Sequence, residues 1–343
     1  MTYDFFKRLS LFGTVLALCV VVLGAYVRLS DAGLGCPDWP GCYGALTVPQ
    51  SEIAIQSAQA VFPDRPIESG KAWKEMAHRY LAGTLGLVVL AIFLGGWRLK
   101  ASMKVHRLLP TALLGIIGFQ AILGMWTVTM LLKPAIVSAH LIGGMTTLAL
   151  LTWITHRHWG ADASITVSPT LKLFIRGSLL ILLGQIFLGG WTSTNYAALA
   201  CTDFPTCHGA WVPAMDFKDA FHLVRDLGQS ENGGNLTLPA LVAIQWTHRI
   251  GALITFIYLS VLAFKLMNIP PLRIIALLLL ATLFAQVCIG IANLAFQLPL
   301  ALAVSHNLGA ALLVIILVVL NSKVTSKKCS YKNTEARCQC AQQ

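Results

Sequence analysis

Residues 274–322 read IIALLLLATLFAQVCIGIANLAFQLPLALAVSHNLGAALLVIILVVLNS and contain no Asp, Glu, Lys or Arg. A membrane-spanning helix needs about 20 apolar residues, so this stretch is long enough for two crossings. Gln297, Leu298 and Pro299 supply a natural divide between them. A soluble domain of this size has no core that could bury so much continuous apolar surface, and the stretch therefore indicates a membrane protein.

Six earlier segments are also long and apolar, with at most one charged residue in each. Each is at least 18 residues long, which is enough for a helix to cross about 30 Å of hydrocarbon. Together with 274–322, they predict an all-α polytopic membrane protein with eight transmembrane helices. The six segments are 9–27, 80–97, 108–132, 134–155, 177–202 and 236–264.

The composition disfavours other classes of protein. Of the 343 residues, 56% are hydrophobic and 11% are charged, whereas about a quarter are charged in a soluble domain. A soluble enzyme is therefore not expected. The net charge of +11 would suit a nucleic-acid ligand, but in a membrane protein such an excess marks topology. We expect membrane lipid, and no nucleic acid, as a partner.

The distribution of basic residues predicts which side is cytoplasmic. With the N-terminus inside, the inner side carries 16 basic and three acidic residues, for a net charge of +13. The outer side carries nine basic and 11 acidic residues, for a net charge of −2. Because cytoplasmic loops are enriched in Lys and Arg, both termini are predicted inside a plasma membrane of bacterial type. Two long segments, about 31–75 and 203–235, then lie outside, and Trp191 is expected at the membrane interface.

The second half of the chain repeats the first half at offsets of 165 to 170 residues. An even number of spans per repeat inserts both copies in the same sense, so we expect two parallel-repeat four-helix bundles. The predicted units are 1–160 and 161–322, followed by a polar cytoplasmic tail at 323–343. The recurring pairs include Cys36 and Cys201, Cys42 and Cys207, His78 and His248, Gln120 and Gln286, and His140 and His306.

The four recurring histidines lie in the first turns of spans that run from the outer to the inner side. The residue four positions after each histidine is alanine or glycine, which leaves the helix surface beside the ring without bulk. A haem needs an imidazole above and below its iron and space beside each ligand. We therefore predict one bis-histidine haem in each half, held by His78 with His140 and by His248 with His306, toward the outer face.

Other interpretations of these residues stay open at this stage. Small residues also permit close packing of membrane helices. A zinc or di-metal site is the weaker alternative, because neither half has carboxylates or thiolates clustered near its histidine pair. Arg79 and Arg249 follow the first histidine of each pair. They are candidates for contacts with haem propionates, or else interfacial side chains that reach toward water.

The two recurring cysteine pairs lie in the long outer segments, on the oxidising side of the membrane. Each pair encloses a short loop that contains proline. Disulfides Cys36–Cys42 and Cys201–Cys207 are predicted for this compartment. The pattern leaves open whether they are structural or redox-active.

One position breaks the repeat. The residue three before the first histidine is Glu75 in the N-terminal half and Gln245 in the C-terminal half. A carboxylate beside a bound macrocycle can transfer protons or stabilise a developing positive charge, whereas an amide can only form hydrogen bonds. Glu75 is therefore the candidate catalytic residue. The alternative is that it caps the start of its helix, where the helix dipole favours an acidic side chain.

Taken together, these residues resemble the haem A synthase family over nearly the whole chain. The resemblance rests on GLGCPDWPGC at 33–42, its echo LACTDFPTC at 199–207, Glu75 and the four histidines. It implies an oxidoreductase that converts the C8 methyl group of haem O to a formyl group, giving haem A. It also implies different roles for the two halves. Glu75 is catalytic, and His78 and His140 hold the substrate haem O. His248 and His306 hold a haem b cofactor that transfers electrons.

The resemblance further implies partners in the assembly of cytochrome oxidase, including a haem O synthase, and it leaves a homo-oligomer open. Two other functions also stay open. A di-haem electron carrier linked to quinone would have no need of Glu75. A haem transporter would need a path to the inner side of the membrane.

Overall fold

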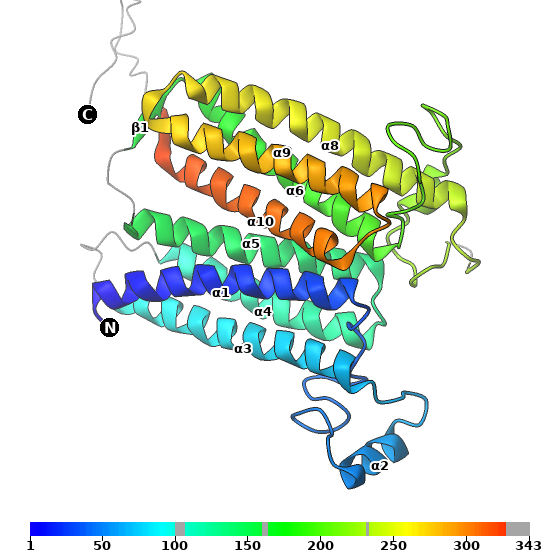
Figure 1. Ribbon diagram of the computed structural model, residues 1–343. Helices are drawn as coiled ribbons and strands as arrows, with labels where there is room; N and C mark the ends of the chain where they lie inside the picture. Colours follow the sequence, from blue (N-terminus) through cyan, green and yellow to red (C-terminus); the bar gives the residue numbers. More distant parts are fainter. Residues whose placement is uncertain (100–106, 160–163, 231–232, 327–343) are drawn as a thin grey trace, which may run out of the picture.

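Eight long helices dominate the computed structural model, which describes residues 1–99, 107–159, 164–230 and 233–326 (Figure 1). All eight are long and apolar enough to cross a membrane. The prediction of an all-α protein with eight membrane-spanning helices is confirmed. They are α1 (Tyr3–Leu29), α3 (Ser69–Arg98), α4 (Leu108–Thr129), α5 (Pro134–Trp159), α6 (Pro169–Thr194), α8 (Leu238–Met267), α9 (Arg273–Ala295) and α10 (Leu300–Lys323).

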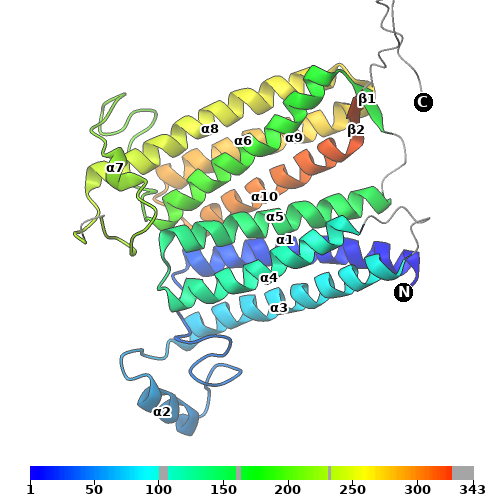
Figure 2. The ribbon, with the colours of Figure 1, turned by 180° about the vertical axis from the view of Figure 1, so that it is seen from behind.

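The remaining elements of the described chain are short. Helices α2 (Glu52–Val61) and α7 (Phe217–Ala220) belong to two long connections at one end of the helix layer (Figure 1). At the opposite end, strands β1 (Ile165–Val167) and β2 (Val324–Ser326) pair in parallel (Figure 2). A 3-10 turn, η2 (Pro270–Leu272), leads into α9.

The long helices form two groups of four with the same internal contacts. In the first group, α1 and α4 each contact both α3 and α5, so α3 and α5 occupy opposite corners of a bundle. In the second group, α6 and α9 contact α8 and α10 in the same way. The groups meet through α5 against α10, α1 against α10, and α5 against α6 (Figures 1 and 2). A twofold relation between the two groups would produce this set of contacts, and the two parallel-repeat bundles stay a prediction.

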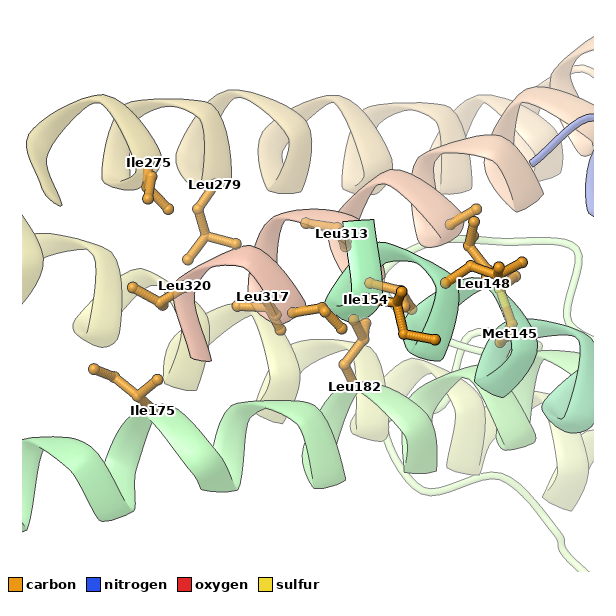
Figure 3. Packing of buried hydrophobic residues seen from close by; sticks show 14 of the residues in the cluster. Met145, Leu148, Ile154, Ile175, Leu182, Ile275, Leu279, Leu313, Leu317 and Leu320 are labelled. Atoms are coloured by element: carbon orange, nitrogen blue, oxygen red, sulfur yellow. The ribbon is translucent and has the colours of Figure 1, made fainter. Parts of the chain in front are cut away.

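A continuous apolar core fills the half of this assembly that lies farther from the long connections. Ile154 of α5 and Leu317 of α10 lie near the centre of the view, Leu148 lies farther along α5, and Leu182 of α6 and Leu279 of α9 extend the cluster (Figure 3). These positions belong to the later turns of α5 and α10 and the earlier turns of α6 and α9. Van der Waals packing of such side chains is a main force that joins helices in a membrane. The half of each bundle that lies nearer the long connections is outside this core.

One predicted span is displaced along the sequence. The prediction was 177–202, but α6 runs from Pro169 to Thr194. It begins early because the Ser168 side chain accepts a hydrogen bond from the N–H of Leu171, and Pro169 suits the first helical position. It ends early because Tyr196 adopts a left-handed conformation (φ 54°), which no pattern of apolar residues reveals.

The expected interfacial position of Trp191 is also wrong. Its side chain is fully buried in a cluster with Ala220 and Ile244, and its indole N–H donates to the carbonyl oxygen of Ala220 (2.8 Å). The connection that contains α7 folds back over this end of α6 and covers the indole. A tryptophan near the end of a span faces the interface only if no loop lies over it.

Candidate functional site

The four histidines lie at the same end of the two bundles, near the long connections. Each falls within the first eleven residues of its helix, on α3, α5, α8 and α10. These helices are the opposite corners of the two bundles, so the histidines of one bundle approach its interior from both sides. His78 lies within electrostatic range of His140, and His248 lies within range of His306. The structure thus brings together the pairs that the sequence predicts.

Each imidazole ring packs against a glycine of the preceding long helix. A Cβ atom built on that glycine would lie 2.9 to 3.4 Å from Cε1 of the ring. The glycine allows the ring edge to approach the helix backbone this closely, most tightly at Gly24 and least tightly at Gly124. The ring is therefore held on one edge at all four positions. The pairs are Gly24 with His78, Gly124 with His140, Gly189 with His248, and Gly290 with His306.

Three of the histidines are also joined to a glutamine on the same preceding helix. The amide nitrogen of Gln120 donates to the backbone carbonyl of His140 (2.9 Å), and Gln286 does the same for His306 (2.9 Å). Gln185 lies 3.2 Å from the carbonyl oxygen of His248 and 3.0 Å from its Nδ1 atom. These bonds fix the histidine-bearing turn of one helix to the next.

The role of these glutamines and glycines was missed from the sequence, although the signal was present. Each glutamine stands four residues before the glycine that touches the ring, and another glycine stands three residues after the histidine. A Cβ atom on that second glycine would overlap the glutamine amide oxygen. Because glycine has no Cβ atom, the glutamine side chain fits there. The pattern is Q-x3-G followed by H-x2-G. The second glycines are Gly143, Gly251 and Gly309.

Glu75 is buried beneath the first disulfide loop, with 4% of its surface exposed. Its Oε2 atom accepts a hydrogen bond from the backbone N–H of Cys36 (2.9 Å), and its Oε1 atom pairs with the guanidinium of Arg79. The helix begins at Ser69, six residues earlier, so Glu75 is not the residue that caps it. Its counterpart Gln245 is also buried, and the amide oxygen of Gln245 has no hydrogen-bond partner in the part of the chain that the structure describes.

Arg79 and Arg249 both bind the disulfide loop above their own helix. Arg79 donates to the carbonyl oxygens of Asp38 (3.0 Å) and Gly41 (2.5 Å). Arg249 donates to the carbonyl oxygens of Cys201 (3.0 Å) and Thr206 (2.8 Å). Neither guanidinium extends freely toward water. Contact with haem propionates stays a prediction for both residues.

The two cysteine loops have the same construction in both halves. Cys36 is bonded to Cys42 and Cys201 to Cys207, with S–S distances of 2.06 and 2.04 Å, and all four side chains are fully buried. An aspartate inside each loop accepts hydrogen bonds from backbone N–H groups just after the second cysteine. At Asp203, bonds from the Thr206 hydroxyl and from backbone N–H groups hold the pKa of the carboxyl well below its usual range.

Gly35 brings the first loop into contact with α3. A Cβ atom there would lie 2.6 Å from the backbone carbon of Lys71 and 2.7 Å from the backbone nitrogen of Ala72. Because backbone atoms cannot rotate away, Gly35→Ala should lift the loop from Glu75 and destabilise the protein by about 1–3 kcal/mol. Thermal unfolding in detergent and the rate at which a reductant opens Cys36–Cys42 measure the effect.

The control for this variant is Gly70→Ala, at the start of the same helix. A Cβ atom at Gly70 meets nothing within 4 Å, so the reduction rate of this variant should match that of the unmodified protein, and its stability should not fall because alanine favours the helix over glycine. Equal reduction rates for Gly35→Ala and Gly70→Ala would contradict the account of the loop contact.

The residues at this end of the bundles fit haem as a ligand. The described residues contain no group of three or more His, Cys, Asp or Glu side chains placed to hold a metal ion, so they do not form the tetrahedral set that zinc prefers. Two imidazoles on opposite helices are the axial ligand set of a haem in a four-helix bundle. Within the described ranges, the Nδ1 atoms of His78, His140 and His306 are buried and have no hydrogen-bond partner. Packing within the described protein thus leaves these three rings with an unsatisfied polar atom.

Comparison with known proteins supplies the family. A family model described as a cytochrome oxidase assembly protein matches residues 7–318. The haem A synthase of Shewanella oneidensis is 47% identical over 310 residues, which cover 90% of this chain and 93% of the relative. The chain belongs to the haem A synthase family. A second haem A synthase, from Caulobacter vibrioides, is 30% identical over 87% of this chain and 90% of its own length.

Proposed function

We propose that this member of the family is itself a haem A synthase, which oxidises the C8 methyl group of haem O to a formyl group. The observation that carries the proposal is the pair of facing histidines in each bundle, with a buried carboxylate beside only one pair. In this proposal His78 and His140 bind the substrate haem O, and His248 and His306 bind a resident haem b. The resident haem b supplies one-electron redox chemistry when it is bound.

The reaction requires a group that accepts protons. Conversion of a methyl group to a formyl group removes four electrons and, with water as the source of oxygen, releases four protons. Glu75 is the acceptor in this proposal, because it is a carboxylate one helical turn before His78 and is shielded from solvent. Its Oε2 atom accepts a hydrogen bond from the Cys36 N–H and its Oε1 atom one from Arg79, and each oxygen has a second lone pair that can take a proton. Because hydrogen bonds to the charged form favour that form, the position of the disulfide loop affects how readily this base takes a proton.

The C-terminal half is suited to a different task. Gln245 stands at the position of Glu75 and cannot accept a proton at neutral pH. A haem held there would keep its substituents unchanged and pass electrons to an external acceptor. We place both haems toward the outer face of a plasma membrane of bacterial type. We also assign haem O synthase and components of cytochrome oxidase assembly as partners.

Pigment analysis of the purified protein tests the proposal. Haem is extracted with acidified organic solvent and identified by mass spectrometry. Haem O or haem A in addition to haem b supports a synthase. Two equivalents of haem b would instead identify an electron carrier, and substoichiometric haem b alone would identify a transporter.

A further inference from the structure

The four histidines differ in how firmly the structure holds them. The pattern Q-x3-G followed by H-x2-G occurs at His140, His248 and His306. At His78 the glycine that touches the ring is kept as Gly24, but Val20 stands in place of the glutamine. Leu81 stands in place of the second glycine. Three of the four sites thus share a construction that the fourth has lost at two positions.

The two differences at His78 have one physical explanation. The glutamine reaches the next helix only where a glycine leaves room for its amide, as Gly251 does for Gln185. The side chain of Val20 cannot form a hydrogen bond and has no amide group. A glycine at position 81 would therefore have no side-chain amide to make room for. The Nδ1 atom of His78 is buried without a hydrogen-bond partner among the described residues, whereas the Nδ1 atom of its counterpart His248 lies 3.0 Å from the amide of Gln185.

A hydrogen bond to an iron-ligating histidine fixes its orientation and strengthens its binding to the metal. With iron on Nε2, the Nδ1 atom of His248 carries the proton, and the Gln185 amide then turns its oxygen toward the ring to accept it. The Gln185 amide thus supports the His248 ring in this orientation and the His248 backbone carbonyl in the other. His140 and His306 have support on the backbone. Among the described residues, His78 has the contact with Gly24 and no glutamine.

We propose that His78 is the exchangeable ligand of the substrate haem, and that Gln185 is a positioning residue that would retain the haem bound by His248. The inference rests on the proposed function and extends it. A substrate haem must enter and leave in every turnover, whereas a resident haem must stay. One weakly held ligand in the substrate site and two supported ligands in the cofactor site meet both requirements. Haem O is then expected to enter and leave on the α3 side of its bundle.

Transfer of haem to apomyoglobin tests this proposal with a readout other than activity. The purified protein is mixed with excess apomyoglobin, and the haem left on the protein is identified by mass spectrometry over time. In the unmodified protein, haem O or haem A should leave at least about tenfold faster than haem b. Gln185→Val should accelerate the loss of haem b about tenfold, since loss of such a partner lowers metal affinity by about 10–100-fold.

Two further variants sharpen the test. Gly184→Ala is the matched control on the same helix, because a Cβ atom there meets nothing within 4 Å, and its haem b should leave at the unmodified rate. The double variant Val20→Gln with Leu81→Gly rebuilds the missing pair and should slow the release of haem O or haem A about tenfold.

Equal release of the two kinds of haem from the unmodified protein would overturn the proposal, as would an unchanged release of haem b from Gln185→Val. Gln185→Val replaces a polar residue of a membrane helix by an apolar one, so it keeps the test decisive if the double variant does not fold. The haem types present before transfer test the proposed function, and the release rates test the ligand proposal. The two failures are therefore distinguishable.

Discussion

Glu75→Gln should leave both haems bound and lower the conversion of haem O to haem A by at least about 100-fold. Glutamine keeps the shape of the side chain and an oxygen that can accept the hydrogen bond from the Cys36 N–H, so the disulfide loop should stay in place. It removes the negative charge that pairs with Arg79 and the capacity to accept a proton. Mass spectrometry of extracted haem measures the ratio of haem A to haem O.

The same exchange in the opposite direction is the control. Gln245→Glu introduces a carboxylate at the equivalent position of the C-terminal half and should leave the conversion at Glu75 intact. Haem O that accumulates on Glu75→Gln with unchanged total haem is the expected signature. Normal haem A from Glu75→Gln would remove Glu75 from the mechanism, and loss of all haem would show that the residue acts on folding or binding.

Replacing one histidine of a pair should empty one haem site and spare the other. We expect His140→Ala to lose haem O and haem A while it retains haem b, and His306→Ala to lose haem b. The loss should exceed the about 10–100-fold effect on affinity that removal of a hydrogen-bond partner of a ligand causes. Because the two pairs lie in different bundles, with α5 against α10 between them, the sites should respond independently.

Optical spectra and extracted pigment together measure this result. Each variant should retain the spectrum of one low-spin bis-histidine haem, and the extracted haem identifies which one remains. His156→Ala is a suitable control, since this residue lies at the opposite end of α5 and bonds to Ser322. Loss of the same haem type from His140→Ala and His306→Ala would contradict the assignment of one pair to each half.

Much of the fold follows from apolar length alone. The eight spans are confirmed because a helix that satisfies its own backbone hydrogen bonds is almost the only way to cross lipid, and the length needed is set by the membrane. Element ends are less predictable. The start of α3 at Ser69, eleven residues before the predicted start at Tyr80, depends on a disulfide loop that packs against its first turns.

The candidate site also has features that the sequence reveals and features that it does not. Repetition singled out Glu75 and the four histidines, because an unrepeated acid in a duplicated sequence is visible without coordinates. The loop partners of Arg79 were not visible. Apart from Glu75, they are backbone carbonyl oxygens about 40 residues away in sequence, and every residue has such an atom.

The sequence by itself determined the number of spans, the duplication and the identity of the ligand candidates, since apolar length and repeated spacing follow from the order of the residues alone. Only the tertiary structure decided which helices stand at opposite corners, that Glu75 lies beneath the Cys36 loop, and that Gln185 reaches His248. The reason is physical. These contacts depend on the close approach of two backbones, which a glycine permits but does not specify until both helices are in place.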